Sequence, residues 1–191
     1  MKVTLIYLDN PFWRIELARI PLFIGDISFN DKRITLEEFR SAKETGFLKD
    51  GTKLPFNQIP CLVVDGVPIA QTGAIARFCG KLSGLYPSED SISCALIDQF
   101  IDFVTDLTNL VYIPSNSPLT EDEKIQHRRI LAEGELKRKL DMLEDNISVN
   151  QTWIVGKEMT IADIAIWRGI GWLASDLVAG IPQPYFVNYP K

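Results

Sequence analysis

The sequence predicts two domains, an α/β domain over residues 1–83 and an all-helical domain over residues 91–191. Three observations lead to this fold class. Strand and helix patterns alternate in the first half of the chain, whereas only the helical period persists in the second half. Between the two halves, residues 84–90 are rich in glycine, proline, serine and acid, which is typical of a linker between domains.

The first two elements are a strand and a helix. Residues 3–8 have a short strand pattern, and Asn10 with Pro11 forms a good N-cap and first-turn pair for a helix that runs to Ile24. Pro21 is unfavourable inside this helix because it has no backbone donor and kinks the chain.

The next two elements repeat this order. Residues 28–34 are expected to form a second strand. Thr35 follows as a hydroxyl cap, and Glu37 and Glu38 place acids in the first turn of another helix, which is expected to end near Gly46.

The Asp65-Gly66 pair predicts a β-hairpin. Short apolar runs flank the pair at residues 61–64 and 67–70, and Asp-Gly between such runs is among the strongest local signals for a two-residue turn. Residues 72–82 then return to a helical period. The first domain therefore has the order βαβα followed by ββα.

Apolar faces at helical spacing predict the helices of the second half. The first face contains Leu96, Phe100, Phe103, Val104 and Leu107. The second contains Ile130, Leu131, Leu136, Leu140 and Leu143. A third helical segment is expected from Ile161 to about Leu177.

Composition and charge exclude several classes of protein. The net charge is −5, and acidic and basic residues are mixed along the chain, so a nucleic-acid partner is not expected. The apolar runs are far shorter than the ~20 residues of a membrane span, and residues 1–8 lack a signal-peptide cleavage site. We therefore expect a cytoplasmic protein with no membrane partner.

The cysteines and the one histidine are not expected to bind a metal. Cys61, Cys79 and Cys94 are odd in number and form no C-x-x-C pair, which favours inert buried thiols in a reducing compartment. His127 lies in a polar run without a nucleophile beside it, so we expect it on a solvated helix.

Three segments of the first half resemble the cytosolic glutathione transferases. Residues 54–60, 64–66 and 71–75 are similar to the family's P-F-G-Q-x-P, V-D-G and Q-S-x-A-I signature in order and in spacing. The resemblance covers almost the whole chain. It implies a thioredoxin-like first domain, a helical second domain, glutathione as co-substrate, and no metal.

The second half carries a further element of this resemblance. Residues 153–156 and the spacing from Thr160 to Asp163 are similar to the family's F-I-V-G and S/T-x-A-D element. Thr160 and Asp163 have the spacing of a capping box, which is a folding signal without a catalytic role.

The resemblance implies that the first domain binds glutathione. An extended tripeptide can add as a strand beside exposed backbone, and a cis bond between Ile59 and Pro60, just after Gln58, would present that backbone. Gln71 and Thr72 begin a helix, where free N–H groups and the helix dipole favour the carboxylate of the γ-glutamyl end. Taken alone, these two residues fit a plain helix cap better than a ligand contact.

Tyr7 is the candidate catalytic residue. Glutathione must react as a thiolate, and because the pKa of a thiol is about 8.5, a donor aimed at the sulfur is needed. Tyr7 matches the tyrosine that the alpha, mu, pi and sigma classes use for this task. The chain departs from those classes by one extra residue between Tyr7 and the matching Arg14 and Glu16. The alternative for Tyr7 is a strand aromatic packed in a core.

Matching positions supply further glutathione contacts. Arg14 corresponds to the arginine that faces the glycyl end. Phe39 and Lys43 have the family's W-x-x-x-K spacing with phenylalanine in place of tryptophan, so the indole hydrogen bond is lost while the Lys43 charge can meet the glycyl carboxylate. Lys53 is a second candidate for this charge, and Lys43 also fits a solvated helix.

The resemblance also implies a homodimer. Residues 95–102 resemble the pi-type A-L-V-D-x-x-x-D run, whose second carboxylate reaches across the dimer to the γ-glutamyl ammonium. Asp102 would have this role. Its alternative is an exposed helix acid.

An apolar electrophile is expected against aromatic side chains from both halves. The candidates are Phe12, Trp13, Phe103 and Tyr112, and each of them also fits a core. Relatives usually continue into another helical segment, so the C-terminal end is expected to be short.

Three functions are compatible with these residues. The first is conjugation of the glutathione thiolate to electrophilic apolar substrates. The second is a glutathione-dependent peroxidase or isomerase on the same site. The third is a non-catalytic binding or structural dimer, which the altered loop and the short end favour. A thioredoxin-type oxidoreductase is disfavoured because residues 10–14 contain no cysteine for a mixed disulfide.

Overall fold

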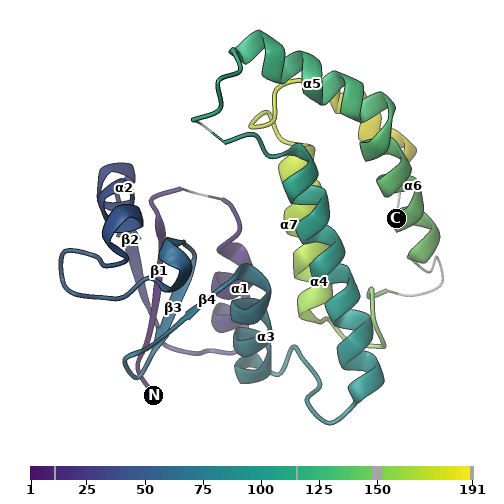
Figure 1. Cartoon of the computed structure of the whole chain (residues 1–191). Helices are drawn as coiled ribbons and strands as arrows, with labels where there is room; N and C mark the ends of the chain where they lie inside the picture. Colours follow the sequence, from purple (N-terminus) through teal and green to yellow (C-terminus); the bar gives the residue numbers. More distant parts are fainter. Residues whose placement is uncertain (11, 115, 148–151, 190–191) are drawn as a thin grey trace. The chain divides into compact units, whose positions relative to one another are not determined.

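The structure is a computed structural model that describes residues 1–191 except 11, 115, 148–151 and 190–191. The chain folds into two compact units, Met1–Ala95 and Leu96–Lys191 (Figure 1).

The first unit is built on a four-stranded mixed sheet. Its strands are β1 (Val3–Leu8), β2 (Asn30–Ile34), β3 (Cys61–Val64) and β4 (Val67–Ala70). They lie in the order β2-β1-β3-β4, in which β1 is parallel to β2 and antiparallel to β3, and β3 is antiparallel to β4. The predicted second strand at 28–34 is therefore two residues shorter than expected.

Helices cover both faces of this sheet. On one face lie α1 (Glu16–Ile24) and α3 (Thr72–Ser83), and on the other lies α2 (Leu36–Thr45) (Figure 1). Because side chains of a strand alternate, β1 supplies both cores: Leu5 packs in the cluster beneath α1 and α3, and Ile6 packs in the cluster on the α2 side.

The turn between β3 and β4 and the start of α2 are explained by residues close in sequence, and both were predicted. Asp65 and Gly66 have φ values of 47° and 88°, the left-handed backbone that a two-residue hairpin turn requires. Thr35 caps α2 through a capping box in which its hydroxyl accepts from the Glu38 N–H at 3.1 Å and the Glu38 carboxylate accepts from the Thr35 N–H at 2.8 Å.

The predicted start of the first helix is wrong. The helix begins at Glu16, with Ile15 at the N-cap and no capping side chain, whereas Asn10 donates its N–H to the Leu8 carbonyl at 2.8 Å in a tight turn. Pro11, the other half of the predicted cap, lies outside the described residues. Pro21 does lie inside α1, as expected, and is buried there.

The second unit is helical. Its helices are α4 (Ser91–Val111), which begins in the first unit, α5 (Glu121–Glu133), α6 (Glu135–Asn146) and α7 (Ile161–Leu173), and a 3-10 segment, η2 (Gln183–Asn188), follows. The predicted apolar face that begins at Ile130 is divided between two helices, because the backbone of Gly134 leaves helical geometry at φ −120° and ψ −106°. The last predicted helix ends at Leu173, before Leu177.

The core of this unit follows the predicted apolar faces only in part. Phe100, Val104 and Leu107 are buried on α4. Leu96 and Ile130, which were assigned to the same faces, are 41% and 62% exposed. Helical spacing therefore identified the faces but not their edges.

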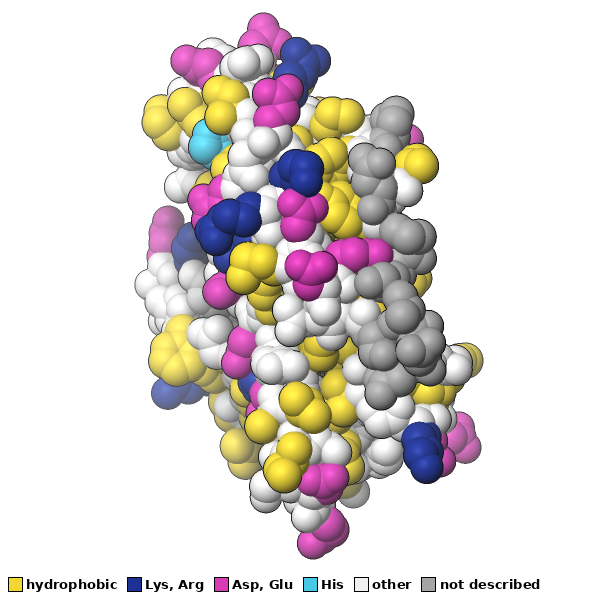
Figure 2. Space-filling view, turned by 90° about the vertical axis from the view of Figure 1, so that its right-hand side faces the viewer, with side chains coloured by type: hydrophobic (Ala, Val, Ile, Leu, Met, Phe, Trp, Pro, Cys, Tyr) yellow, Lys and Arg dark blue, Asp and Glu magenta, His cyan; other side chains and the backbone are white. Residues whose placement is uncertain are grey.

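Acidic and basic side chains are mixed on the surface, as the sequence predicted. Among the described side chains of the face in Figure 2, acidic and basic groups alternate with apolar ones, and His127, the single histidine, is exposed on α5. None of the described helices has the length and apolar character that crossing a membrane requires.

Candidate functional site

The candidate residues of the first unit converge on one end of its sheet. Ile6 pairs with Cys61, and Cys61 pairs with Ala70. One residue beyond these pairs, at the same end of the sheet, lie Tyr7 at the end of β1 and Pro60 before β3, and Gln71 follows β4 there. Three segments far apart in the sequence thus meet at this end.

Tyr7 is held by the core. It is 4% exposed and lies in the cluster beneath α1 and α3, and its register partner on β2 is Arg33. The ring therefore does pack in a core, as one interpretation of the sequence predicted. This packing fixes the residue close to the point where β1 ends at Leu8 and the loop to α1 begins.

That loop carries three other candidates, all partly buried. The Arg14 guanidinium lies over the Trp13 ring, 5.9 Å from its centroid, and such a contact restrains both side chains. Trp13 also packs against the cluster beneath α1 and α3. Phe12 is partly buried in the same loop.

The segment before β3 is close to α2. The Ile59-Pro60 peptide bond is cis, as the resemblance implied. Gln58 is exposed and extended, and the Asn57 side chain donates to the Lys43 carbonyl at 3.0 Å, which brings Lys43 next to this segment. Lys43 itself is an exposed helix residue.

Phe39 and Lys53 flank the same region. Phe39 packs against the cluster on the α2 side, so phenylalanine here has a core role in place of the indole contact of the family. Lys53 is exposed, and its carbonyl lies 4.0 Å from the Cys61 sulfur at the start of β3.

Gln71 has a backbone conformation that a non-glycine residue rarely adopts. Its φ and ψ are 74° and 122°, which costs on the order of 1–3 kcal/mol and persists only where the surrounding structure imposes it. It is the N-cap residue of α3, yet its exposed side chain makes no capping hydrogen bond. Gln71 therefore occupies the cap position without capping the helix through its side chain, and α3 begins at Thr72 without a side-chain cap.

The other candidates belong to the helical unit. Asp102 is exposed on α4. Phe103 is partly buried, and the Lys139 ammonium lies 5.6 Å from its ring centroid. Tyr112 follows α4 and is 45% exposed. All three side chains belong to the second unit.

Known protein families match both units. The family model described as "Glutathione S-transferase, N-terminal domain" matches residues 3–80, and the corresponding C-terminal domain matches residues 100–182. Glutathione S-transferase 2 of Caenorhabditis elegans is 30% identical over 174 residues, which cover 89% of this chain and 88% of that protein.

The chain belongs to the glutathione S-transferase family. Glutathione S-transferase A2 of Homo sapiens is 27% identical over 182 residues, covering 93% of this chain and 78% of that protein. A solved structure described as rat hPGDS complexed with a quinoline has a TM-score of 0.79 and 24% identity, and covers 100% of this chain and 86% of that chain. The predicted fold, family and enzyme class are confirmed.

Two thiols of this transferase, those of Cys61 and Cys79, are unsuited to act as nucleophiles in place of glutathione. Burial raises the pKa of Cys61 to about 11 and that of Cys79 to about 12, so both stay protonated near neutral pH. All three cysteines are free. Among the described residues, no group of three His, Cys, Asp or Glu side chains is placed to hold a metal.

A set of charged residues beside Tyr7 was not predicted from the sequence. Asp31 and Arg33 stand on β2, and Glu16 and Arg19 stand on α1, where they form ion pairs. Two sequence signals point to these residues. Asp31 and Arg33 alternate along a strand, and Glu16 and Arg19 have the i, i+3 spacing of a helical ion pair.

Proposed function

We propose that this glutathione transferase activates its co-substrate with the Tyr7 hydroxyl and conjugates it to an apolar electrophile. The observation that carries the proposal is the convergence of Tyr7, Pro60 and Gln71 at one end of the sheet. In the strand order β1-β3-β4, the backbone segment before β3 lies between the end of β1 that carries Tyr7 and the N-terminus of α3.

The chemistry needs the sulfur to lose its proton. A thiol with a pKa of about 8.5 is mostly protonated at neutral pH, and each unit by which its pKa falls corresponds to about 1.4 kcal/mol. A phenol that donates to the sulfur stabilises the anion more than the thiol, because a hydrogen bond to a charged acceptor is the stronger one. Tyr7 therefore lowers the pKa of the bound thiol.

The rest of the tripeptide is held at its ends and along its backbone. Ile59 offers its main chain to the cysteinyl residue, as an added strand would require. Gln71 and Thr72 bind the γ-glutamyl carboxylate at the uncapped start of α3. Arg14, Lys43 and Lys53 supply positive charge for the glycyl carboxylate, and Gln58 lies beside Ile59.

The complete site uses both domains and two subunits. We assign the domains to residues 1–83 and 91–191, with the linker at 84–90. In a homodimer, Asp102 meets the γ-glutamyl ammonium of the glutathione bound by the other subunit. Phe12 and Trp13 from the loop contact the electrophile, with Phe103 and Tyr112 from the helical domain. The three free thiols agree with action in the cytosol.

Replacing Tyr7 by phenylalanine tests the activation step. Tyr7→Phe keeps the buried ring and removes the donor, so kcat with an aromatic halide should fall roughly hundredfold while glutathione affinity is retained. Tyr86→Phe is the matched control, since Tyr86 is another buried tyrosine and lies beyond the far end of α3. Equal rates in wild type and Tyr7→Phe would refute the role of Tyr7.

Two further assays separate the three candidate functions. Retention on immobilised glutathione measures binding, and conjugation of an aromatic halide measures transfer. Turnover of an organic hydroperoxide without conjugation would indicate a peroxidase. Retention without any turnover would indicate a non-catalytic relative.

A further inference from the structure

Five charged residues form a continuous chain of ion pairs in the first unit. The Arg33 Nη1 atom lies 3.0 Å from Asp9, and its Nε atom lies 3.1 Å from Asp31. Arg19 binds Asp31 through two nitrogen atoms, each at 3.1 Å. Arg19 also binds Glu16 at 2.8 Å. We call Asp9, Glu16, Arg19, Asp31 and Arg33 the loop clamp.

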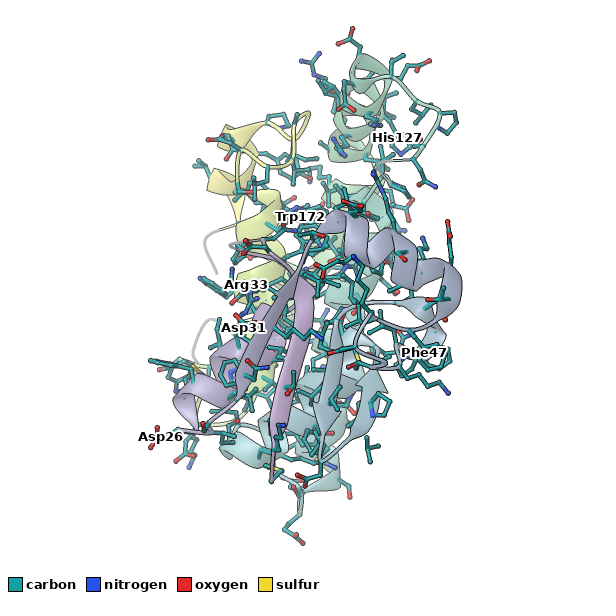
Figure 3. All side chains as sticks on the ribbon, turned by 90° about the vertical axis from the view of Figure 1, so that its left-hand side faces the viewer. Asp26, Asp31, Arg33, Phe47, His127 and Trp172 are labelled. Atoms are coloured by element: carbon teal, nitrogen blue, oxygen red, sulfur yellow. The ribbon has the colours of Figure 1, made fainter. Side chains whose placement is uncertain are left out.

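The loop clamp lies on the same face of the sheet as Tyr7. Leu5 pairs with Asp31, and Tyr7 pairs with Arg33, in the parallel β1–β2 register. Residues paired in this way project to the same side, here the side covered by α1. Asp31 and Arg33 are neighbours on β2 in Figure 3.

The loop clamp joins the two ends of the loop between β1 and α1. Asp9 is the first residue after β1 and also donates its N–H to the Ile34 carbonyl at 3.2 Å. Glu16 is the first residue of α1. Between them lie residues 10–15, which include Arg14 and the extra residue relative to the tyrosine classes.

Part of this series of ion pairs is buried, and its interactions are therefore stronger than those of a surface ion pair. The side chains of Arg19 and Glu16 are only 11% and 12% exposed, so solvent screens their interaction weakly. The Asp31 carboxylate accepts from two guanidinium groups, and planar two-point contacts of this kind fix geometry as well as charge. The hydrogen bond from Arg33 to Asp9 is the largest cause that raises the pKa of Arg33.

We propose that the loop clamp is a positioning device that sets the β1–α1 loop, and with it Arg14, in register with Tyr7 for glutathione activation. The proposal rests on the proposed function. It assigns no contact with the substrate to these five residues. It also explains how an extra residue is accommodated after Tyr7, because both ends of the loop are tied to the same strand.

The test compares two cations of β2 that project to opposite faces. Arg33→Gln removes the cation that joins Asp9 to Asp31 in the loop clamp. Lys32→Gln is the matched control: it removes the same charge from the neighbouring position, where Lys32 pairs with Asp50 on the α2 side. The measurements are the pKa of the enzyme-bound glutathione thiol, read from thiolate ultraviolet absorbance, the glutathione Kd, and kcat with an aromatic halide.

We expect Arg33→Gln to raise the pKa of the bound thiol and to lower kcat by roughly tenfold to a hundredfold, because a small misplacement of reacting groups has this effect. Lys32→Gln should match wild type in both. If Arg33→Gln changes only the melting temperature and matches Lys32→Gln in thiol pKa and kcat, the role of the loop clamp is merely structural and the proposal is overturned.

A double-mutant cycle provides a second test that needs no large perturbation. Asp9→Asn removes one charge at an exposed position with little change in size, and should raise the pKa of the bound thiol in the same direction. Combined with Arg33→Gln it should add nothing, because both changes remove the same contact. Additive effects would overturn the proposal.

Failure of the proposed function is recognised separately, since Tyr7→Phe would then leave thiol pKa and kcat unchanged.

Discussion

The two units reach their folds under different backbone constraints. In the first unit, five non-glycine residues have positive φ: Asp26, Phe56, Asn57, Asp65 and Gln71. Among the described residues of the helical unit, positive φ occurs only at Gly156 and Gly180. Within the described residues, positive φ at non-glycine positions is thus confined to the unit that carries the candidate glutathione site. Strain of this kind often accompanies pre-organised binding sites.

The helical unit is specified instead by caps and close packing. Thr160 and Asp163 form the predicted capping box at the start of α7. Asp163 does more than the sequence indicated, because its carboxylate also accepts from the Ile154 N–H at 2.8 Å. On the same helix, a side chain at Gly169 would come within 2.7 Å of Val104 on α4. In this unit, losing a hydrogen bond or adding a side chain at a close contact should lower folding stability. Replacing a strained residue should add little.

The largest expected effect is therefore on the stability of the helical unit. Asp163→Ala removes the acceptor for the N–H groups of Ile154 and Thr160, at 2.8 and 2.7 Å. Because these donors are partly buried, the free energy of unfolding should fall by about 2 to 4 kcal/mol. Urea unfolding followed by tryptophan fluorescence measures this change.

The same motif in the first unit supplies the control. Glu38→Ala breaks the capping box of α2, where the carboxylate accepts from the backbone of the cap residue alone and not from a second segment. The expected loss is about 1 kcal/mol or less. Equal losses in the two variants would show that the additional bond to Ile154 contributes nothing.

The strained unit should respond differently, through binding. Gln71→Gly places at this position the one residue that adopts φ 74° and ψ 122° without strain, so folding stability should change by no more than about 1 kcal/mol. The glutathione Kd should nevertheless rise about tenfold, because the side chain that we propose as a contact of the γ-glutamyl carboxylate is lost. Isothermal titration of the folded protein measures the Kd.

Asp26→Gly is the matched change outside the site. Asp26 also has positive φ, 51°, and is exposed at the end of this unit remote from Arg33 (Figure 3). It should show the same small change in stability with no change in Kd. A Kd for Gln71→Gly equal to that for Asp26→Gly would mean that strain at Gln71 serves folding alone.

This contrast also explains which predictions succeeded. The Asp65-Gly66 hairpin and the Thr35 cap depend on contacts within a few residues, so the sequence was sufficient to predict them. Asn10 carries the same kind of signal, yet the helix begins at Glu16, because tertiary contacts determine the loop there. The break at Gly134 interrupts an apolar face that continues in sequence.

The candidate site was predictable to a similar degree. Its residues were found by resemblance, and the register of β1, β3 and β4 brings Tyr7, Pro60 and Gln71 to one end of the sheet. Their roles stay predictions. The loop clamp was missed because its pairs join β2, α1 and the loop, and such pairs become apparent only when the strand register is known.

The smallest expected effect is a pH dependence confined to the first unit. The hydrogen bond from Lys32 lowers the pKa of Asp50 to about 2, below the value of about 3.9 for an unfolded chain. Because the folded pKa is the lower one, this pair stabilises the fold above pH ~4, and the contribution is lost as the pH falls toward ~2. The Asp50 side chain is 55% exposed, so the contribution should be only about 0.5 kcal/mol. Urea unfolding of wild type and Asp50→Asn should therefore differ near neutral pH and converge as the pH falls to ~2. A difference that persists unchanged at acid pH would mean that Asp50 acts through its hydrogen bonds and not through its charge.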